Sequence, residues 1–151
     1  MARLLNGVEL VCKDESVVDA AEALDGKIVG LYFSAGWCTP CRQFSPKLRR
    51  FYEIVKAAGK NFEVVFVSRD HKAEDLVEYY EEHHGDWTYL AFGNPKIKEL
   101  LEMFEVETVP TLRIIKPCGV VISQHARDQV VEKGTEKALE LYEIWEAFAE
   151  F

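Results

Sequence analysis

Two cysteines separated by two residues, Cys38 and Cys41, are the residues of this chain best suited to chemistry. They follow an apolar run and precede a helical pattern, so Cys38 is expected at the point where a strand ends and a helix begins. The free N–H groups and the dipole of a helix N-terminus stabilise a thiolate, the attacking species in thiol–disulfide exchange. The pair is therefore predicted to cycle through a Cys38–Cys41 disulfide, with Cys38 as nucleophile and Cys41 as resolving thiol.

A zinc half-site and two inert core thiols are the alternatives for this pair. Zinc needs two further ligands at suitable spacing, and the remaining candidates are isolated or adjacent: Cys12, Cys118, His71, His83, His84 and His125. Pro40, between the two cysteines, suits the first turn of a helix, where no N–H is needed. We therefore expect redox chemistry with no metal and no bound cofactor, and the roles of Cys12 and Cys118 stay open.

The second chemical feature is Val109-Pro110-Thr111, which opens a strand after a helix. An X-Pro bond adopts the cis form at a cost of only about 0.5–1 kcal/mol. A cis Pro110 would bring the Val109 backbone beside Cys38, where it could hold an extended substrate by strand-like hydrogen bonds. A trans proline at a strand start is the alternative, and the cysteine motif favours the cis form.

The surrounding elements follow from hydrophobic periodicity. Continuous apolar runs predict buried strands over 27–34 and 62–68, a weaker pattern predicts an edge strand over 7–11, and 111–115 with 120–123 predict a hairpin. Helical spacing predicts helices over 16–24, from the cysteine motif to 58, and over 74–84, 95–104 and 135–148. This alternation predicts an α/β fold, with a mixed central sheet and helices on both faces.

Composition restricts the class of protein. A chain of 151 residues with 48% hydrophobic residues is expected to form a single domain over 1–151. Its 18 basic and 26 acidic residues give a net charge of −8, which argues against nucleic acid and membrane partners. The first residues lack the apolar stretch of a signal peptide, so we expect a cytoplasmic or nuclear protein that is not secreted.

Residues 32–46, which include the cysteine motif, resemble the active-site run of the tryparedoxin and nucleoredoxin branch of the thioredoxin superfamily. Residues 62–68 are similar to the next strand of that branch, and the stretch around Trp87 is also similar. Residues 84–87 and 145–148 are most similar to the nucleoredoxin-like group related to the cone viability factors.

The resemblance implies a thioredoxin-like fold, disulfide reductase activity and a cis bond at Pro110. It also implies a substrate-binding rim, formed by Trp37, His71, Val109 and Arg127. Classical thioredoxins have a buried Asp six residues before the nucleophile, where this chain has Tyr32. Asp70 or a water molecule is therefore the candidate proton relay for the resolving thiol.

Three functions follow from this resemblance. The first is a monomeric reductase of protein disulfides, re-reduced by an external dithiol, an upstream thiol or a flavoprotein reductase. The second is a non-catalytic signalling or interaction module of the cone viability type. The third, a glutathione-using activity, ranks last because the sequence has no recognisable site for a glutathione carboxylate. The intact cysteine pair favours the first.

Overall fold

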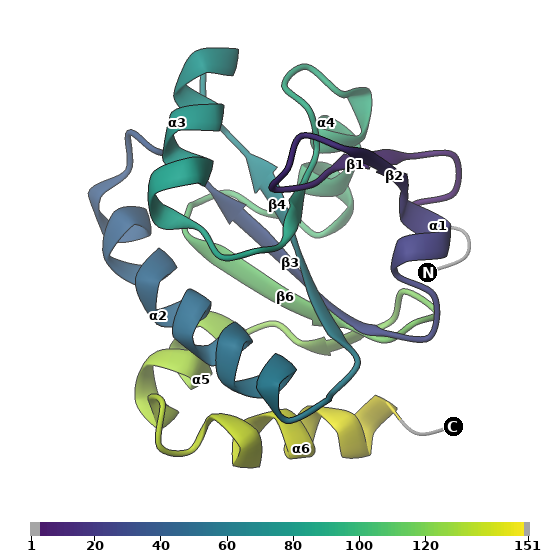
Figure 1. Ribbon diagram of the computed structural model, residues 1–151, viewed down its shortest axis with the longest axis vertical. Coiled ribbons are helices and arrows are strands. Elements are labelled where there is room, and N and C mark those ends of the chain that lie inside the picture. Colours follow the sequence, from purple (N-terminus) through teal and green to yellow (C-terminus); the bar gives the residue numbers. More distant parts are fainter. Residues whose placement is uncertain (1–3, 150–151) are drawn as a thin grey trace.

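The structure, a computed structural model, describes residues 4–149, which form a seven-stranded sheet flanked by helices (Figure 1). The strands are β1 (Glu9–Val11), β2 (Val17–Asp19), β3 (Ile28–Ser34), β4 (Phe62–Ser68), β5 (Thr88–Tyr89), β6 (Thr111–Ile115) and β7 (Val121–Ser123). The helices are α1 (Ala20–Ala23), α2 (Thr39–Ala57), α3 (Ala73–His83), α4 (Pro95–Met103), α5 (Ala126–Lys133) and α6 (Ala138–Ala149). None of these helices is long and apolar enough to cross a membrane.

Strand β3 lies inside the sheet, whose order is β2-β1-β5-β4-β3-β6-β7. It pairs parallel to β4 and antiparallel to β6, and every one of its residues is buried. A strand covered on both faces and both edges needs a continuous apolar sequence, which β3 has. Because β3 ends at Ser34, the loop that leads to Cys38 begins at a strand inside the sheet.

Alternate side chains of β3 enter two separate cores, because successive residues of a strand point to opposite faces. Tyr32 packs in the core that also holds buried residues of α2, α3, α5 and α6. Leu31 and Phe33 pack in the other core, with residues of α1 and α4. Figure 1 shows α2, α5 and α6 together on one side of the sheet and α1 on the other. The mixed sheet with helices on both faces is thus confirmed.

The first helix predicted from the sequence is partly wrong. Residues 17–19 form strand β2, which pairs antiparallel with β1, and only α1 remains helical. Val17 and Val18 are β-branched and favour a strand. The carboxylate of Asp19 accepts a hydrogen bond from Glu22 N at 3.2 Å and caps the helix, which therefore begins at Ala20. The 7–11 segment is not an edge strand either, since β1 lies between β2 and β5.

Two short elements were not predicted. Strand β5 has only two residues and pairs with β1 and β4. Helix α5 lies between the predicted hairpin and the predicted last helix, in a region for which the sequence analysis predicts no element. It buries only Ala126 and Val130, so its apolar stripe is too weak to show a helical period.

The core beside α3 contains a buried histidine, His84. It is enclosed by the rings of Tyr32, Phe66, Tyr79, Tyr80 and Trp87. Its Nδ1 accepts a hydrogen bond from Trp87 Nε1 at 3.0 Å, so Nε2 carries the proton of the neutral ring and has no hydrogen-bond partner. Burial, helped by the charges of Lys13 and His83, holds the pKa of His84 well below its usual value.

We expect this histidine to make the protein acid-sensitive. In the unfolded chain His84 takes up a proton as the pH falls through about 6.5, whereas the folded protein excludes that proton. The stability present above pH 6.5 should therefore fall by about 1.4 kcal/mol per pH unit toward pH 5. Urea unfolding across this range should show this loss of stability with falling pH in the wild type. It should also show it in the control variant His83→Gln, which replaces a partly exposed histidine and keeps His84. An equal slope in His84→Phe would contradict the assignment.

Candidate active site

Cys38 is the N-cap residue of α2 and follows directly from the loop after β3. Its backbone is extended, and its Sγ accepts a hydrogen bond from Cys41 N at 3.3 Å. The side chain lies at the molecular surface but is only 7% exposed. One of the free N–H groups of the helix N-terminus is therefore directed at this sulfur.

Cys41 lies one helical turn further on and is fully buried. Burial is the main cause that raises the pKa of the Cys41 thiol to about 12, and the hydrogen bond with Cys38 acts in the same direction. Hydrogen bonds from the Ser34 hydroxyl and the Ala35 backbone act in the opposite direction. Both cysteines are free thiols. The arrangement therefore places a slightly exposed cysteine, Cys38, in front of a fully buried one, Cys41.

The Val109–Pro110 peptide bond is cis, the form that the sequence analysis favours. The Cys38 thiol lies 3.6 Å from the carbonyl oxygen of Val109 and donates a weak hydrogen bond to it. Arg127, in the first turn of α5, donates from Nη1 to the carbonyl of Pro110 at 3.5 Å. The structure thus brings Val109 and Arg127 to the same side of the cysteine motif, although they are far from it in sequence.

Trp37 directly precedes Cys38 in the sequence and packs against His71. The Trp37 side chain is 55% exposed, and its Nε1 donates to the carbonyl of Arg69 at 3.2 Å. Its ring stacks on the imidazole of His71, with centroids 5.9 Å apart and planes at 14°. All four residues expected in the rim therefore lie near the cysteine motif, and their contact with substrate stays a prediction.

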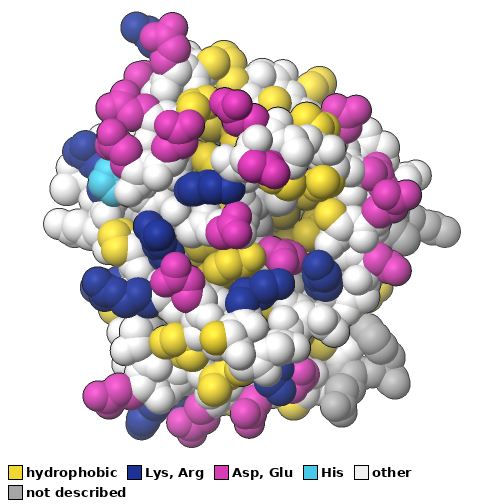
Figure 2. Space-filling view, viewed as in Figure 1, with side chains coloured by type: hydrophobic (Ala, Val, Ile, Leu, Met, Phe, Trp, Pro, Cys, Tyr) yellow, Lys and Arg dark blue, Asp and Glu magenta, His cyan; other side chains and the backbone are white. Residues whose placement is uncertain are grey.

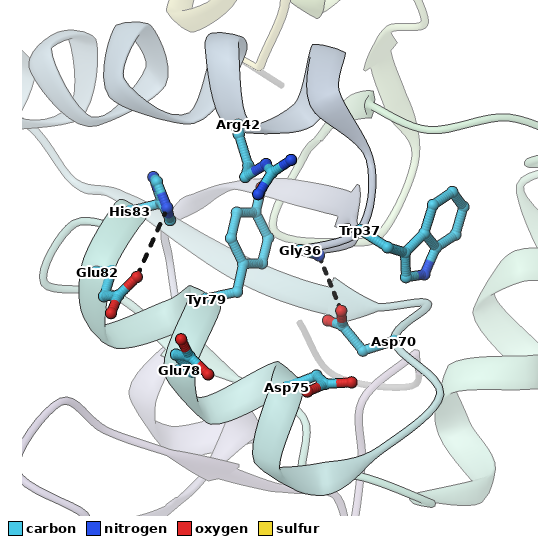
Figure 3. A pocket seen from close by; sticks show the side chains of 9 residues that line it. All are labelled: Gly36, Trp37, Arg42, Asp70, Asp75, Glu78, Tyr79, Glu82 and His83. Carbon is cyan, nitrogen blue, oxygen red and sulfur yellow. Dashed lines mark hydrogen bonds and ion pairs between the residues drawn. The ribbon is translucent and has the colours of Figure 1, made fainter.

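Asp70 holds the loop that precedes Cys38. Its Oδ1 accepts a hydrogen bond from Gly36 N at 2.8 Å (Figure 3), and its Oδ2 accepts one from the Ser68 hydroxyl at 2.6 Å. The fit between loop and helix is close, because a Cβ on Gly36 would come within 2.9 Å of the Tyr79 Cβ. These contacts connect Asp70 to the loop backbone, and its part in proton transfer remains a prediction.

Two grooves flank the motif. One lies between the start of α2 and helix α3, with carboxylates along α3, as Figures 2 and 3 show; it is lined by Gly36, Trp37, Arg42, Asp70, Asp75, Glu78, Tyr79, Glu82 and His83. The other lies between α2 and α5 and contains basic and apolar side chains; it is lined by Pro40, Gln43, Phe44, Lys47, Pro110, Arg127, Asp128 and Val131. Among residues 4–149 no group of three or more His, Cys, Asp or Glu could hold a metal ion.

Sequence reasoning missed the hydroxyl groups beneath the motif. The hydroxyls of Tyr32, Ser45, Tyr79 and Ser34 form consecutive hydrogen bonds, and the Tyr32 hydroxyl also donates to the backbone carbonyl of Cys41 at 3.4 Å. One signal was available: Ser45 lies one helical turn after Cys41, on the same face of α2. The partners on β3 and α3 become neighbours of α2 only when the sheet forms.

Comparison with known proteins agrees with this geometry. Residues 26–121 match the thioredoxin-like family. The tryparedoxin of Trypanosoma brucei brucei is 45% identical over 73% of this chain and 76% of its own length. Probable nucleoredoxin 1 of Arabidopsis thaliana is 40% identical over 75% of this chain and 19% of its own. Human nucleoredoxin is 35% identical over 74% of this chain and 25% of its own. The chain thus spans about a fifth to a quarter of the nucleoredoxins.

Solved structures give the same result. Thioredoxin from Wuchereria bancrofti superposes with a TM-score of 0.82 at 43% identity, covering 93% of this chain and 97% of its own. Tryparedoxin II complexed with glutathionylspermidine has a TM-score of 0.76 at 36% identity, covering 83% and 86%. The predicted fold and branch are confirmed, and the narrower nucleoredoxin-like grouping stays a prediction. The chain belongs to the thioredoxin-like family of oxidoreductases, with tryparedoxins and nucleoredoxins among its relatives.

Proposed function

We propose that this protein reduces disulfides of protein substrates by dithiol exchange. The observation that carries the proposal is the placement of the two cysteines: Cys38, 7% exposed, is the N-cap of a helix, and Cys41, fully buried, lies one helical turn behind it. A buried second thiol is protected from outside reagents but can reach a sulfur bonded to Cys38. Two-step exchange requires these two roles: one thiol attacks the substrate disulfide, and a second thiol attacks the resulting mixed disulfide.

In the first step the Cys38 thiolate attacks one sulfur of the substrate disulfide. The substrate S–S bond breaks, a mixed disulfide forms with Cys38, and the first substrate sulfur leaves as a thiolate that takes up a proton. In the second step the Cys41 sulfur attacks Cys38 Sγ and releases the second substrate sulfur. Two electrons pass to the substrate, and the protein is left with a Cys38–Cys41 disulfide.

The surroundings of Cys38 support docking of an extended substrate segment. The backbone of Val109 lies beside the sulfur and can add a strand-like hydrogen bond to the segment. The stacked rings of Trp37 and His71 offer an apolar platform on one side, and Arg127 offers a cation on the other. We assign Asp70 to positioning of the loop before Cys38, because its carboxylate binds the Gly36 backbone.

The oxidised protein then needs a reductant. An external dithiol, an upstream thiol or a flavoprotein reductase would attack the Cys38–Cys41 disulfide and return both thiols. One similar protein, a tryparedoxin, has been solved complexed with glutathionylspermidine. We therefore include glutathione-type thiols among the candidate donors for this chain.

Reduction of insulin disulfides, followed by the turbidity of the released chains, tests this function. The wild type should accelerate reduction over the donor alone, with dithiothreitol, thioredoxin reductase and glutathione compared as donors. Cys38→Ser should fall to the rate of the donor alone because no attacking thiolate remains. Cys118→Ser, which removes an exposed cysteine outside the motif, should keep the wild-type rate. A wild type no faster than every donor alone would refute the proposal.

A further inference from the structure

The groove between α2 and α5 begins beside the reacting sulfur. One of its lining residues, Pro40, lies between the two cysteines of the motif. Another, Pro110, follows Val109, whose carbonyl oxygen lies 3.6 Å from Cys38 Sγ. The volume of the groove is about 220 Å³, roughly that of seven water molecules. A substrate segment held by the Val109 backbone therefore has room for a side chain in this groove.

The walls of this groove are largely apolar. Phe44 and Pro110 are buried beneath it, and Pro40 and Val131 are exposed at its rim. Val131 is 48% exposed, so a bound segment can still remove much of its apolar surface from water. These walls suit a side chain whose stem is built of methylene groups.

Two cations, Lys47 and Arg127, line the same groove, and they differ in their partners. Arg127 donates from Nε and Nη2 to Asp128 Oδ1 at 3.3 and 3.2 Å, and from Nη1 to the carbonyl of Pro110 at 3.5 Å. Lys47 is exposed and makes no side-chain hydrogen bond or ion pair with any residue in the described range 4–149. The charge of Lys47 is therefore available to a bound molecule.

The second groove beside the motif, between the start of α2 and helix α3, has the opposite character. The carboxylates of Asp75, Glu78 and Glu82 lie along α3 there (Figure 3). The whole protein also carries a net charge of −8. An acidic segment is therefore repelled by the α3 groove and attracted by Lys47, so charge determines which of the two grooves it enters.

We propose that the groove between α2 and α5 selects disulfide substrates with an acidic residue next to the reacting cysteine, and that Lys47 determines this specificity. The carboxylate of the substrate binds the Lys47 ammonium, and the stem of the acidic side chain packs on the apolar walls. The inference rests on the proposed function and names its substrate class. Lys47 binds substrate without touching the reacting sulfurs, so it changes which disulfides react and not how they react.

Peptides with a single cysteine, blocked as a mixed disulfide with 5-thio-2-nitrobenzoate, test this selection. One series carries Glu, Gln or Lys directly before the cysteine, and a second series carries them directly after it. Reduced protein in a Cys12→Ser/Cys118→Ser background attacks the disulfide, and absorbance follows the released nitrothiolate. Each rate is divided by the rate of the same peptide with dithiothreitol, which removes differences in the intrinsic reactivity of the peptides.

In at least one series the Glu peptide should react about five-fold faster than the Lys peptide, the effect of one exposed ion pair. The Gln peptide should fall between them, and high salt should weaken the preference because it screens exposed charges. Lys47→Glu should reverse the preference in that series. Each preference is a ratio between two peptides on one protein, so a change in the amount of folded protein cancels.

Arg50→Glu is the matched control. Arg50 is also exposed on α2, has no printed partner in the described part of the chain and lies outside both grooves. Its replacement changes the net charge by the same amount as Lys47→Glu. It should keep the wild-type preference for the Glu peptide.

Three results would overturn the inference alone: equal normalised rates for the Glu and Lys peptides in both series of the wild type, a preference for Glu that survives in Lys47→Glu, or equal changes in Lys47→Glu and Arg50→Glu. Release of nitrothiolate no faster with the protein than without it, for every peptide, would overturn the proposed function as well, because Cys38 would then not attack a disulfide.

Discussion

A Cys41→Ser protein is expected to accumulate mixed disulfides with its substrates, whereas a Cys38→Ser protein should trap almost none. The first variant keeps the attacking sulfur on the helix N-terminus but lacks the thiol that releases the product. The second variant lacks the attacking sulfur itself. Non-reducing gels of reduced protein incubated with cell lysate, followed by mass spectrometry, should show the difference as nearly all or nothing.

Both substitutions replace sulfur by oxygen in a side chain of almost the same shape, so neither should unfold the domain. Circular dichroism of both variants checks this. The interaction-module alternative predicts a different pattern, in which both variants keep partner binding and neither forms a covalent complex. A folded, reduced Cys41→Ser protein that captures no disulfide partner would contradict the enzymatic account.

Phe62→Ala should cause the largest loss of stability among simple core substitutions. Phe62 begins β4, is fully buried, and packs against the rings of Phe51, Tyr142 and Trp145 at centroid distances of 5.8, 5.6 and 6.2 Å. These rings belong to α2 and α6, so Phe62 holds both helices on the sheet. Truncation of such a residue costs about 3–5 kcal/mol, a large share of the 5–15 kcal/mol typical of a domain.

Phe148→Ala is the matched control for this prediction. Phe148 lies on α6 but is 65% exposed, so its loss should change the free energy of unfolding by less than about 0.5 kcal/mol. Urea denaturation of both variants measures the difference. Similar losses for the two would show that burial of Phe62 does not anchor these helices.

Elements with a strong local pattern were predictable from sequence. Strands β3 and β4 are continuous apolar runs, and α2 carries its buried side chains at helical spacing. The two reacting residues were also predictable, because their chemistry lies in one short motif. The cis bond at Pro110 and the contact of Val109 with Cys38 were predicted by combining the Val109-Pro110-Thr111 segment with the cysteine motif, although the two segments lie 71 positions apart, and the family resemblance implied the same cis bond.

The elements and hydrogen bonds that the sequence did not predict depend on tertiary contacts. β2 and β5 are too short to show a period, and they form because they pair with β1. The consecutive hydrogen bonds among the hydroxyls of Tyr32, Ser45, Tyr79 and Ser34 join two residues of β3, one of α2 and one of α3, which no local sequence pattern connects. Tyr32 was recognised as the replacement for a buried Asp, but its partners Ser45 and Tyr79 appear only in the folded protein.

The most direct test of the central claim is to locate the covalent bond in the complexes trapped by Cys41→Ser. Peptide mass spectrometry of these complexes, digested without reduction, identifies the protein sulfur that carries the substrate. The account predicts that the substrate cysteine is bonded to Cys38 in every complex. Attachment to Cys12 or to the exposed Cys118 in place of Cys38 would contradict it.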